Sequence, residues 1–485
     1  MKRYQLLIDG EWRNASSDQW QPNINPANTD DVIGEFASAT VEDVTAAVEA
    51  AHRAFPAWRG TPMVKRGDIL YKAANLLEAR LEDVAQAMTR EEGKTLIESR
   101  GETSRGVAIL RYFAGEASQP EGEVYPTALP NRMLYTRREP TGVVGLITPW
   151  NFPIAIPLWK IAPALVYGNT VVFKPAELTP LTAWHIVDVL VQAGLPKGVL
   201  NFVNGSGRVM GNALVNHPDV KAVSFTGSNT VGRAIQRQVT ERGGKVQLEM
   251  GGKNPVVVLD DANLALAVEM VTRGAMKSTG QKCTATSRVF VQAGVYKQFS
   301  EALIETVKAL RVGDGMDANS YLGPAVSRDQ QQSVLDYLRI GQEEGAKVGA
   351  GGADLVGAAY DKGFYVPPTV FLDADVKSRL MQEEIFGPVV ALTPIETLND
   401  AIEAANGVPY GLSASIISQD IGKIMRFVDG IQAGMVHVND ETAGAEPQVP
   451  FGGVKDSSSH SREQGKAARE FYTLMKTVYL DYPGV

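Results

Sequence analysis

The sequence predicts an α/β protein with two units of alternating strands and helices. Between Val143 and Val258, short apolar strands such as VVGLI, TVVFK and KAVSF alternate with segments of helical periodicity. A second alternation begins with NPVVVL at Asn254 and continues to about Asn439. Such alternation is typical of parallel sheets with crossover helices. A chain of 485 residues is also too long for one hydrophobic core, so two or three domains are expected.

The segments outside these alternations have their own patterns. Residues 4–36 predict short strands and turns, and apolar residues at helical spacing predict helices from Val41 to about Ser118. Arg132–Ile147 is strand-like, with Pro140 and Gly142 between its halves, and forms either a projecting arm or an ordinary hairpin. The last segment, FYTLMKTVYLD, alternates like a strand, and we expect it to pair with this arm or with another subunit's sheet.

Composition and charge argue against several classes of partner. Lys and Arg total 47 against 55 Asp and Glu, and no basic block could follow a nucleic-acid backbone. The N-terminal MKRYQLLIDGEW lacks the apolar core of a signal peptide, and no apolar run approaches the length of a membrane span. We therefore expect a cytoplasmic protein without a nucleic-acid or membrane partner. The five histidines show no metal-ligand spacing, so no metal is expected.

The only cysteine, Cys283, lies in the stretch Lys277–Val291. A single thiol can form neither an internal disulfide nor a Cys-ligated metal site, so it is either inert or a nucleophile. A predicted helix over Leu264–Ala275 precedes it, Gly280 breaks that helix, and the β-branched strand Arg288–Val291 follows. A connection between two rigid elements favours the nucleophile, because the main-chain N–H of the cysteine can then point at the group it attacks.

Two further polar residues are candidates for catalysis. Glu249, in LEMGG, is either a solvated strand end or a general base in a tight turn. Asn151, in PWNFP, has a proline two residues away on each side, which fixes the backbone and aims the side-chain amide. Such an amide can stabilise an oxyanion.

Two glycine-containing turns are candidates for binding a dinucleotide. The run Gly205–Gly211 is one residue too long for the G-x-G-x-x-G pattern and is a weak signal. The run Phe225–Gly232 follows the strand KAVSF and opens a helix. There, Gly227 and Ser228 either present main-chain N–H groups and a hydroxyl to a pyrophosphate or form a plain helix cap.

Lys174 and Glu177, in FKPAEL, follow the strand TVVF, where a ribose would lie beyond the carboxyl end of a strand. A carboxylate at this point accepts hydrogen bonds from the 2′- and 3′-hydroxyls and repels a 2′-phosphate. The pair therefore favours NAD over NADP.

Seven motifs, PWNFP, FKPAELTP, FTGSNTVG, LEMGGKNP, GQKC, EEIFGP and PFGGVKDS, occur in this order between Pro149 and Ser457. Together they resemble the aldehyde dehydrogenase superfamily, and the resemblance runs over essentially the whole chain. Within it, STGQKCTATSR and SSSHSREQG are most similar to the bacterial 2,5-dioxovalerate (α-ketoglutarate semialdehyde) dehydrogenases. The resemblance implies NAD(P)-dependent oxidation of a carboxylated semialdehyde, 2,5-dioxovalerate to 2-oxoglutarate, through a cysteine thiohemiacetal and thioester.

Alternative substrates are succinate or glutarate semialdehyde and a broad range of aliphatic aldehydes. The presence of Glu249 argues against the branch of the family that releases its product to CoA. A catalytically silent binding protein with the same fold is the alternative from another class, and intact Cys283, Glu249 and Asn151 argue against it.

The resemblance also implies individual roles. Cys283 matches the nucleophile, Asn151 the oxyanion donor beside the main-chain N–H of Cys283, Glu249 the general base, and Lys160 a lysine near the catalytic centre. The implied cofactor-binding positions are Ile147, Trp150, Lys174, Glu177, Gly207, Gly211, Phe225, Gly227, Ser228, Val231, Glu384 and Phe386.

By the same resemblance, a substrate tunnel to Cys283 is lined from the helix Glu102–Tyr112 and the loop Ala443–Phe451. The implied substrate-binding residues are Arg105, Phe152, Trp159, Thr284 and Phe451. An arginine in a mostly apolar tunnel is costly unless it meets an anion, and its planar fork suits a carboxylate. We therefore expect Arg105 to bind the distal carboxylate of the substrate, and the alternative is a salt bridge with Glu102 or another nearby acid.

The implied architecture has three parts. A Rossmann-like NAD(P)-binding domain covers residues 1–121 and 141–252, and an α/β catalytic domain covers 253–465. A small β element, 122–140 with 466–485, is expected to join subunits into a homodimer or homotetramer.

Overall fold

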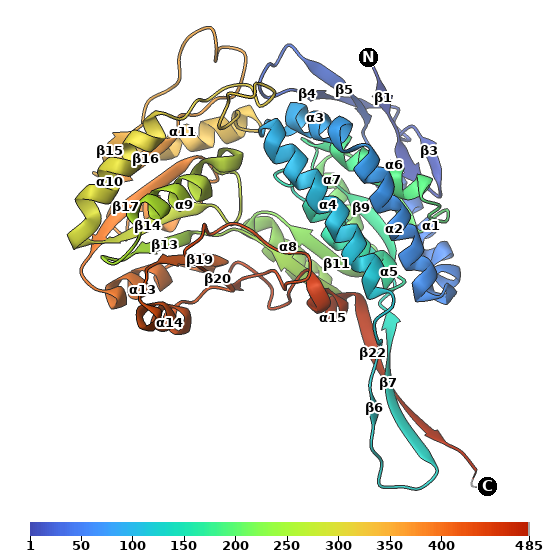
Figure 1. Ribbon diagram of the computed structural model, residues 1–485. Helices are drawn as coiled ribbons and strands as arrows, with labels where there is room; N and C mark the ends of the chain where they lie inside the picture. The colour runs from blue at the N-terminus through green and yellow to red at the C-terminus, as the bar shows by residue number, and fades with distance from the viewer. Residues whose placement is uncertain (484–485) are drawn as a thin grey trace.

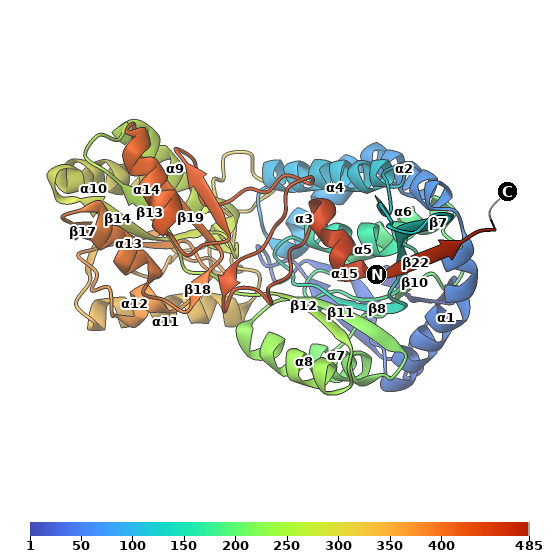
Figure 2. The ribbon, with the colours of Figure 1, turned by 90° about the horizontal axis from the view of Figure 1, so that it is seen from below.

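The computed structural model describes residues 1–483 as two lobes, each built on a seven-stranded sheet, with a narrow arm below them (Figure 1). Seen from below, the two lobes lie side by side, each with helices around its sheet (Figure 2). The strand orders are β12-β11-β8-β9-β10-β2-β3 and β15-β16-β17-β14-β13-β19-β20. The predicted α/β fold class is confirmed. None of the described helices combines the length and apolar character needed to cross a membrane.

The first sheet is doubly wound. Its strands are β2 (Leu6–Ile8), β3 (Glu11–Arg13), β8 (Val143–Ile147), β9 (Thr170–Lys174), β10 (Leu200–Phe202), β11 (Val220–Thr226) and β12 (Lys245–Glu249). Its crossover helices are α5 (Ala155–Val166), α6 (Pro180–Gln192), α7 (Gly207–Asn216) and α8 (Asn229–Glu241). The chain builds β8, β9 and β10 in one direction and then returns to add β11 and β12 on the other side of β8, all in parallel. The strand order therefore reverses between β8 and β11, and in such sheets ligands bind at the carboxyl ends of the strands near this point.

Helices cover both faces of this sheet. On one face, α2 (Met63–Ala79), α3 (Leu81–Glu92) and α4 (Leu96–Glu116) pack against α5 and α6. On the other face, α1 (Val41–Gly60) packs against α7. Helix α3 ends at Gly93, which has φ 96°, and α4 begins with a capping box between Thr95 and Glu98. Buried Phe113 of α4 and Leu158 of α5 belong to the same core cluster. The outer strands β1 (Arg3–Tyr4), β4 (Trp20–Ile24) and β5 (Val32–Ala37) form a small separate sheet.

The second sheet is parallel except at β15, which pairs antiparallel with β16. Its strands are β13 (Asn254–Val258), β14 (Thr286–Gln292), β15 (Lys347–Ala350), β16 (Thr369–Leu372), β17 (Val389–Ile395), β19 (Ser413–Ile417) and β20 (Met435–Val438). The helical segments of this lobe are α9 (Leu264–Met276), η1 (Lys277–Gly280), α10 (Ala293–Lys308), α11 (Arg328–Glu343), α12 (Arg379–Gln382), α13 (Leu398–Asn406) and α14 (Ile421–Gly430). Strands β13 and β19 are buried along their whole length, as expected of a sheet covered on both faces.

The last part of the chain returns to the first lobe. Strand β18 (Tyr410–Gly411) pairs with β21 (Val454–Lys455), and η2 (Gly465–Ala467) and α15 (Ala468–Tyr472) lead into the final strand.

The arm consists of β6 (Val124–Tyr125), β7 (Arg132–Pro140) and β22 (Thr473–Asp481). Strands β7 and β22 pair antiparallel from Thr473↔Pro140 to Asp481↔Arg132, so the expected pairing of the last segment with the arm is confirmed. Only the first half of the strand-like stretch Arg132–Ile147 belongs to the arm, because the second half enters the first sheet as β8. Gly142, with φ 135°, marks the point where the chain leaves the arm.

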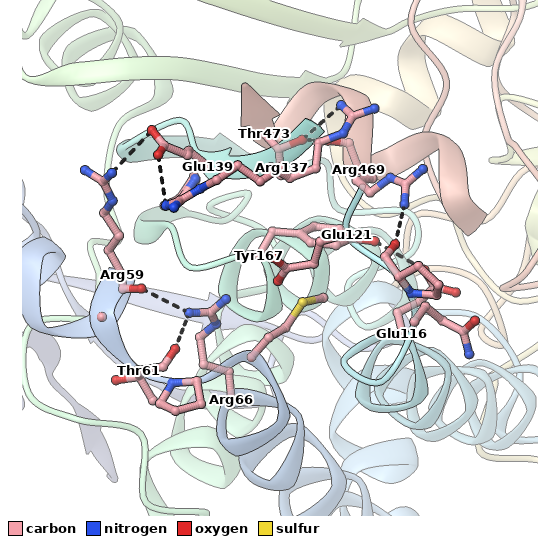
Figure 3. A pocket seen from close by; sticks show the side chains of 17 residues that line it. Arg59, Thr61, Arg66, Glu116, Glu121, Arg137, Glu139, Tyr167, Arg469 and Thr473 are labelled. Carbon is pink, nitrogen blue, oxygen red and sulfur yellow. Dashed lines mark hydrogen bonds and ion pairs between the residues drawn. The ribbon is translucent and has the colours of Figure 1, made fainter. Parts of the chain in front are cut away.

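A cavity of about 410 Å³ lies where the arm meets the helices (Figure 3). Its charged groups are mostly engaged: Glu139 pairs with Arg59 at 3.3 Å and with Arg137 at 3.0 Å. The guanidinium of Arg66 donates to the main-chain carbonyl of Val166 at 2.7 Å. The Arg59–Glu139 pair therefore joins the base of the arm to α1.

Candidate active site

The turn that carries Cys283 is conformationally strained. Ser278, Thr279 and Gly280 all adopt left-handed backbone angles, with φ of 53°, 54° and 65°. A left-handed conformation costs an ordinary residue roughly 1–2 kcal/mol, and a β-branched residue such as Thr279 adopts it rarely. Surrounding contacts must therefore hold this turn. The main-chain N–H of Ser278 donates to Glu98 at 2.7 Å, and the Thr279 hydroxyl donates to the carbonyl of Gly323 at 3.0 Å.

The main chain at Cys283 and just after it is held by the second sheet. The side-chain amide of Asn254, at the start of β13, donates to the carbonyls of Cys283 and Ala285, both at 2.9 Å. Gly252 lies so close that a Cβ there would be 2.5 Å from the carbonyl oxygen of Cys283. A glycine is thus required for the linker after Glu249 to approach the thiol.

The thiol of Cys283 is partly exposed and lines a cavity of about 390 Å³ between the two lobes. Burial, together with the negative charges of Glu384 and Glu249, raises the pKa of Cys283 to about 12. The main-chain N–H groups of Thr284 and Cys283 act in the opposite direction and lower this pKa. A main-chain N–H beside the sulfur is the kind of donor that can stabilise an oxyanion.

Asn151 lies between β8 and α5 and is 3% exposed. Its side-chain nitrogen donates to the main-chain carbonyl of Gln281 at 2.9 Å, two residues before Cys283. The structure therefore brings the predicted amide donor directly against the loop of the predicted nucleophile. A primary amide has two N–H donors, and the Gln281 carbonyl occupies one of them.

Glu249 lies at the end of β12 and is 2% exposed. The Ser458 hydroxyl donates to its Oε2 at 2.6 Å, whereas its Oε1 has no partner among the described residues. Burial and the nearby charge of Glu463 raise the pKa of Glu249 well above its ordinary value. A buried carboxyl of this kind can accept a proton near neutral pH.

Lys160, on α5, lies behind this carboxylate in a buried polar network. Its ammonium donates to the Ser224 hydroxyl at 2.8 Å and forms an ion pair with Glu463. The charge of Lys160 acts to lower the pKa of Glu249, whereas that of Glu463 acts to raise it.

All five predicted substrate residues line the same cavity as Cys283. Phe152, Trp159 and Phe451 form its apolar wall, and the Trp159 and Phe451 ring centroids are 5.2 Å apart. The guanidinium of Arg105 forms no ion pair with any residue in 1–483, and its buried Nε has no hydrogen-bond partner there. The alternative pairing with Glu102 is absent, because the Glu102 carboxylate binds Lys94 instead.

The predicted ribose and pyrophosphate residues lie at the carboxyl ends of the strands next to the reversal point. Lys174 is buried at the end of β9, and the exposed Glu177 accepts a 2.6 Å hydrogen bond from the main-chain N–H of Gly207, at the start of α7. Beyond β11, Gly227 and Ser228 open α8, and the buried hydroxyl of Thr226 has no described partner. Open donors and acceptors at this edge fit a dinucleotide.

The remaining predicted cofactor positions divide into two groups. Ile147, Gly211 and Phe225 are buried beneath the strand ends, whereas Val231 is exposed on the first turn of α8. Glu384 accepts a 2.9 Å hydrogen bond from the N–H of Gly252. Trp150 and Phe386 meet edge to face, with ring centroids 5.4 Å apart. Because Trp150 follows β8 and Phe386 precedes β17, both lobes contribute to this wall.

Residues 12–478 match the Aldehyde dehydrogenase family. The chain belongs to the aldehyde dehydrogenase family. It is 50% identical over 477 residues to the alpha-ketoglutaric semialdehyde dehydrogenase of Bacillus subtilis, with 98% of each chain covered. It is 44% identical over 482 residues to the 2,5-dioxopentanoate dehydrogenase of Saccharolobus solfataricus, with 99% of each covered.

A crystal structure of betaine aldehyde dehydrogenase from Staphylococcus aureus in complex with NAD+ superposes with a TM-score of 0.96. It is 36% identical, and the alignment covers 99% of this chain and 96% of that one. The aldehyde dehydrogenase fold, with its cofactor-binding and catalytic lobes, is thereby established for this chain.

The sequence did not predict several contacts in this aldehyde dehydrogenase site. Ser458 and Glu463 lie in SSSHSREQG and Asn254 in LEMGGKNP, but their contacts are with residues far away in the sequence, which the motifs do not indicate. No sequence motif indicated a role for Lys94. Within residues 1–483, no group of three His, Cys, Asp or Glu side chains is arranged to hold a metal ion.

Proposed function

We propose that this chain is a hydrolytic, NAD(P)-dependent aldehyde dehydrogenase that oxidises 2,5-dioxovalerate to 2-oxoglutarate. The observation that carries the proposal is a single cavity lined by both Cys283 and Arg105. Asn151 is hydrogen-bonded to the loop before the thiol, and the charge of Glu249, at the end of β12, acts on the thiol. Arg105 supplies a cation without an ion-pair partner in the described part of the chain, as an anionic substrate requires.

In the first step, the Cys283 thiol releases its proton to solvent, the resulting thiolate bonds to the aldehyde carbon, and the carbonyl π electrons move to the oxygen, which becomes an oxyanion. The free N–H of the Asn151 amide and the main-chain N–H of Cys283 stabilise this charge. NAD(P)+, when bound, supplies the acceptor for the hydride that leaves the substrate carbon. The acyl group then remains on the sulfur as a thioester.

In the second step, Glu249 takes one proton from a water molecule, the resulting hydroxide bonds to the thioester carbon, and the C–S bond breaks, which releases the carboxylic acid and the Cys283 thiolate. The unpartnered Oε1 of Glu249 is free to accept this proton, while Ser458 holds the other oxygen in place. The Lys160–Glu463 pair lies behind Glu249 and keeps the carboxylate in a buried, polar setting.

The cofactor would lie across the carboxyl ends of β8, β9 and β11. Lys174 and Glu177 would hold the adenosine ribose, and Glu384 and Phe386 the nicotinamide end. A carboxylate at Glu177 disfavours a 2′-phosphate, which supports NAD as the preferred cofactor. The NAD+ found in the Staphylococcus aureus relative supports the same choice.

We also infer a homodimer or homotetramer. Strand β22 is an edge strand of the arm, and its exposed Leu474, Met475, Tyr479 and Leu480 present apolar surface. Strand β20 is an unpaired edge of the second sheet. Exposed edges and apolar patches of this kind are normally covered by a partner.

A substrate panel tests the proposed function. Initial rates of cofactor reduction are measured for 2,5-dioxovalerate, glutarate semialdehyde, succinate semialdehyde and uncharged pentanal, each with NAD and NADP. We expect the highest kcat/KM for 2,5-dioxovalerate with NAD. Equal efficiency with pentanal would contradict the anionic substrate, and the absence of reduction with every aldehyde would contradict the activity itself.

A further inference from the structure

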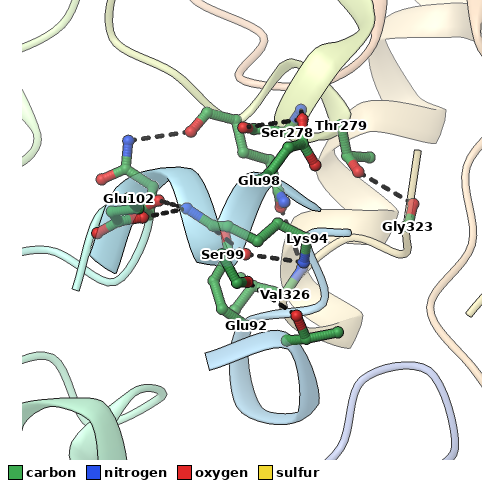
Figure 4. Close-up of polar contacts among 12 residues, drawn as sticks. Glu92, Lys94, Glu98, Ser99, Glu102, Ser278, Thr279, Gly323 and Val326 are labelled. Carbon is green, nitrogen blue, oxygen red and sulfur yellow. Dashed lines mark hydrogen bonds and ion pairs between the residues drawn. The ribbon is translucent and has the colours of Figure 1, made fainter. Parts of the chain in front are cut away.

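Lys94 occupies the junction between the end of α3 and the start of α4 and is 2% exposed. Figure 4 shows its side chain among Glu92, Glu98 and Glu102. Its ammonium donates to Glu102 Oε2 at 2.7 Å and to the main-chain carbonyl of Asn151 at 2.6 Å. It also lies 4.3 Å from the ring centroid of Phe152. Lys94 therefore contacts the backbone of the residue whose side chain faces the Cys283 loop.

Neighbouring carboxylates stabilise the charged form of Lys94. Burial acts to lower the pKa of Lys94, but the carboxylates of Glu102 and Glu92 outweigh it, so the net shift is upward. A buried ammonium is tolerated only when its donors meet acceptors in good geometry. The Asn151 carbonyl is one of those acceptors, so the ion pair and the position of Asn151 are coupled.

Glu102 extends this hold to the next helix. Its Oε1 accepts hydrogen bonds from the main-chain N–H groups of Ile154 at 2.8 Å and Ala155 at 3.1 Å, at the start of α5. One buried ion pair therefore holds both ends of the segment 151–155.

We propose that Lys94 is a positioning residue for the oxyanion site: with Glu102, it fixes the main chain of Asn151 so that the second N–H of the side-chain amide faces the oxygen of the reacting carbonyl. The inference rests on the proposed function, because it concerns the same tetrahedral intermediate on Cys283. Lys94 itself does not touch the reacting atoms. A misplacement of about 1 Å at such a donor costs on the order of 100-fold in rate.

A double-mutant cycle between Lys94 and Asn151 tests this role. We expect Lys94→Met to lower kcat by roughly 10- to 100-fold, with KM changed by less than about threefold. In the Asn151→Ala background, the same substitution should lower kcat by less than about threefold, because the donor it positions is already missing. Equal losses in both backgrounds, or no loss in either, would overturn the proposal.

Two further variants keep the test interpretable. Lys94→Met leaves the buried charge of Glu102 without its ion-pair partner, which can prevent folding. If the single variant does not fold, the double variant Lys94→Met/Glu102→Gln, which removes both charges, replaces it in the same cycle. Arg100→Met is the matched control, because Arg100 lies on α4, as Glu102 does, but pairs with Glu82 on the exposed surface at 2.8 Å. Thermal unfolding of each variant verifies that a folded protein is compared.

The cycle is run with two reactions. Aldehyde oxidation requires the complete proposed function, whereas cofactor-free cleavage of 4-nitrophenyl acetate requires only acyl transfer to Cys283 with loss of nitrophenolate. Both pass through a tetrahedral oxyanion on the sulfur, so the coupling between Lys94 and Asn151 is expected in both. Coupled ester cleavage without aldehyde oxidation would overturn the proposed function alone. Uncoupled losses in an enzyme that oxidises aldehydes would overturn the positioning role alone.

Discussion

The hydroxyl of Ser458 donates a 2.6 Å hydrogen bond to Glu249, and the two residues come from distant parts of the chain. The main-chain N–H of Met250 also donates to the carbonyl of Ser457 at 2.8 Å, so the loop after β21 is attached to the end of β12. This attachment leaves one oxygen of Glu249 unpartnered among the described residues and holds the other.

The first prediction concerns the pH dependence of turnover. The pKa of Glu249 is raised by burial, and a carboxyl with a raised pKa is protonated below that pKa and cannot act as a base. Activity limited by hydrolysis should therefore rise with pH. The bond from Ser458 lowers the pKa of Glu249, so Ser458→Ala should move the rising limb of kcat to higher pH. Ser461→Ala, whose hydroxyl has no described partner, is the control. If kcat of Ser458→Ala rose over the same pH range as kcat of the unmodified enzyme, that result would argue against Glu249 as the base.

The second prediction concerns the reactivity of the thiol. Burial, Glu384 and Glu249 raise the pKa of Cys283 to about 12, so little thiolate exists near neutral pH in the free enzyme. Iodoacetamide should modify Cys283 more slowly than free cysteine, and the rate should increase as pH rises. Glu384→Gln removes one of the negative charges and should accelerate the reaction. Because the chain has one cysteine, intact mass measures it directly. Modification as fast as that of free cysteine would contradict the raised pKa.

The third prediction concerns substrate charge. Arg105→Met removes the guanidinium from the cavity and should raise KM for 2,5-dioxovalerate by about tenfold or more, which corresponds to about 1.4 kcal/mol or more. The kcat and KM for pentanal should stay nearly unchanged. Arg111→Met is the control. Arg111 lies on the same helix as Arg105, α4, but its guanidinium pairs with Glu78 of α2 on the exposed surface. Equal losses on both aldehydes would show that Arg105 does not bind a carboxylate.

The fourth prediction concerns cofactor choice. Glu177→Ala removes the carboxylate that now accepts the N–H of Gly207. Repulsion of a 2′-phosphate then disappears, and kcat/KM with NADP should rise relative to NAD by roughly tenfold. Steady-state rates with both cofactors give this ratio. An unchanged ratio would place the discrimination elsewhere.

Local patterns predicted the sheets and the positions that now surround the thiol. The strand-and-helix alternation predicted the parallel strands β8 to β12 of the first sheet and the second α/β unit, because most of these buried strands are short apolar runs that periodicity can find. It did not predict that β2 and β3, from the start of the chain, complete the first sheet. The prolines around Asn151 and the glycines after Glu249 marked turns that the structure places near Cys283. The roles of these residues stay predictions until they are tested.

Long-range contacts could not be predicted in this way. Lys160 meets Glu463 across 303 positions, and Lys94 meets Asn151 across 57, with no local pattern to link either pair. The left-handed conformation of Ser278 and Thr279 could not be predicted from the sequence either, because neither residue type favours positive φ. Tertiary contacts impose it.

Accumulation of an acyl-enzyme on Cys283 tests the central claim most directly. Glu249→Gln is mixed rapidly with 2,5-dioxovalerate and NAD, and reduced cofactor and peptide mass are followed together. We predict a burst of about one reduced cofactor per enzyme, slow turnover afterwards, and an acyl group on the peptide that contains Cys283. No burst together with an unmodified Cys283 would contradict covalent catalysis by this thiol.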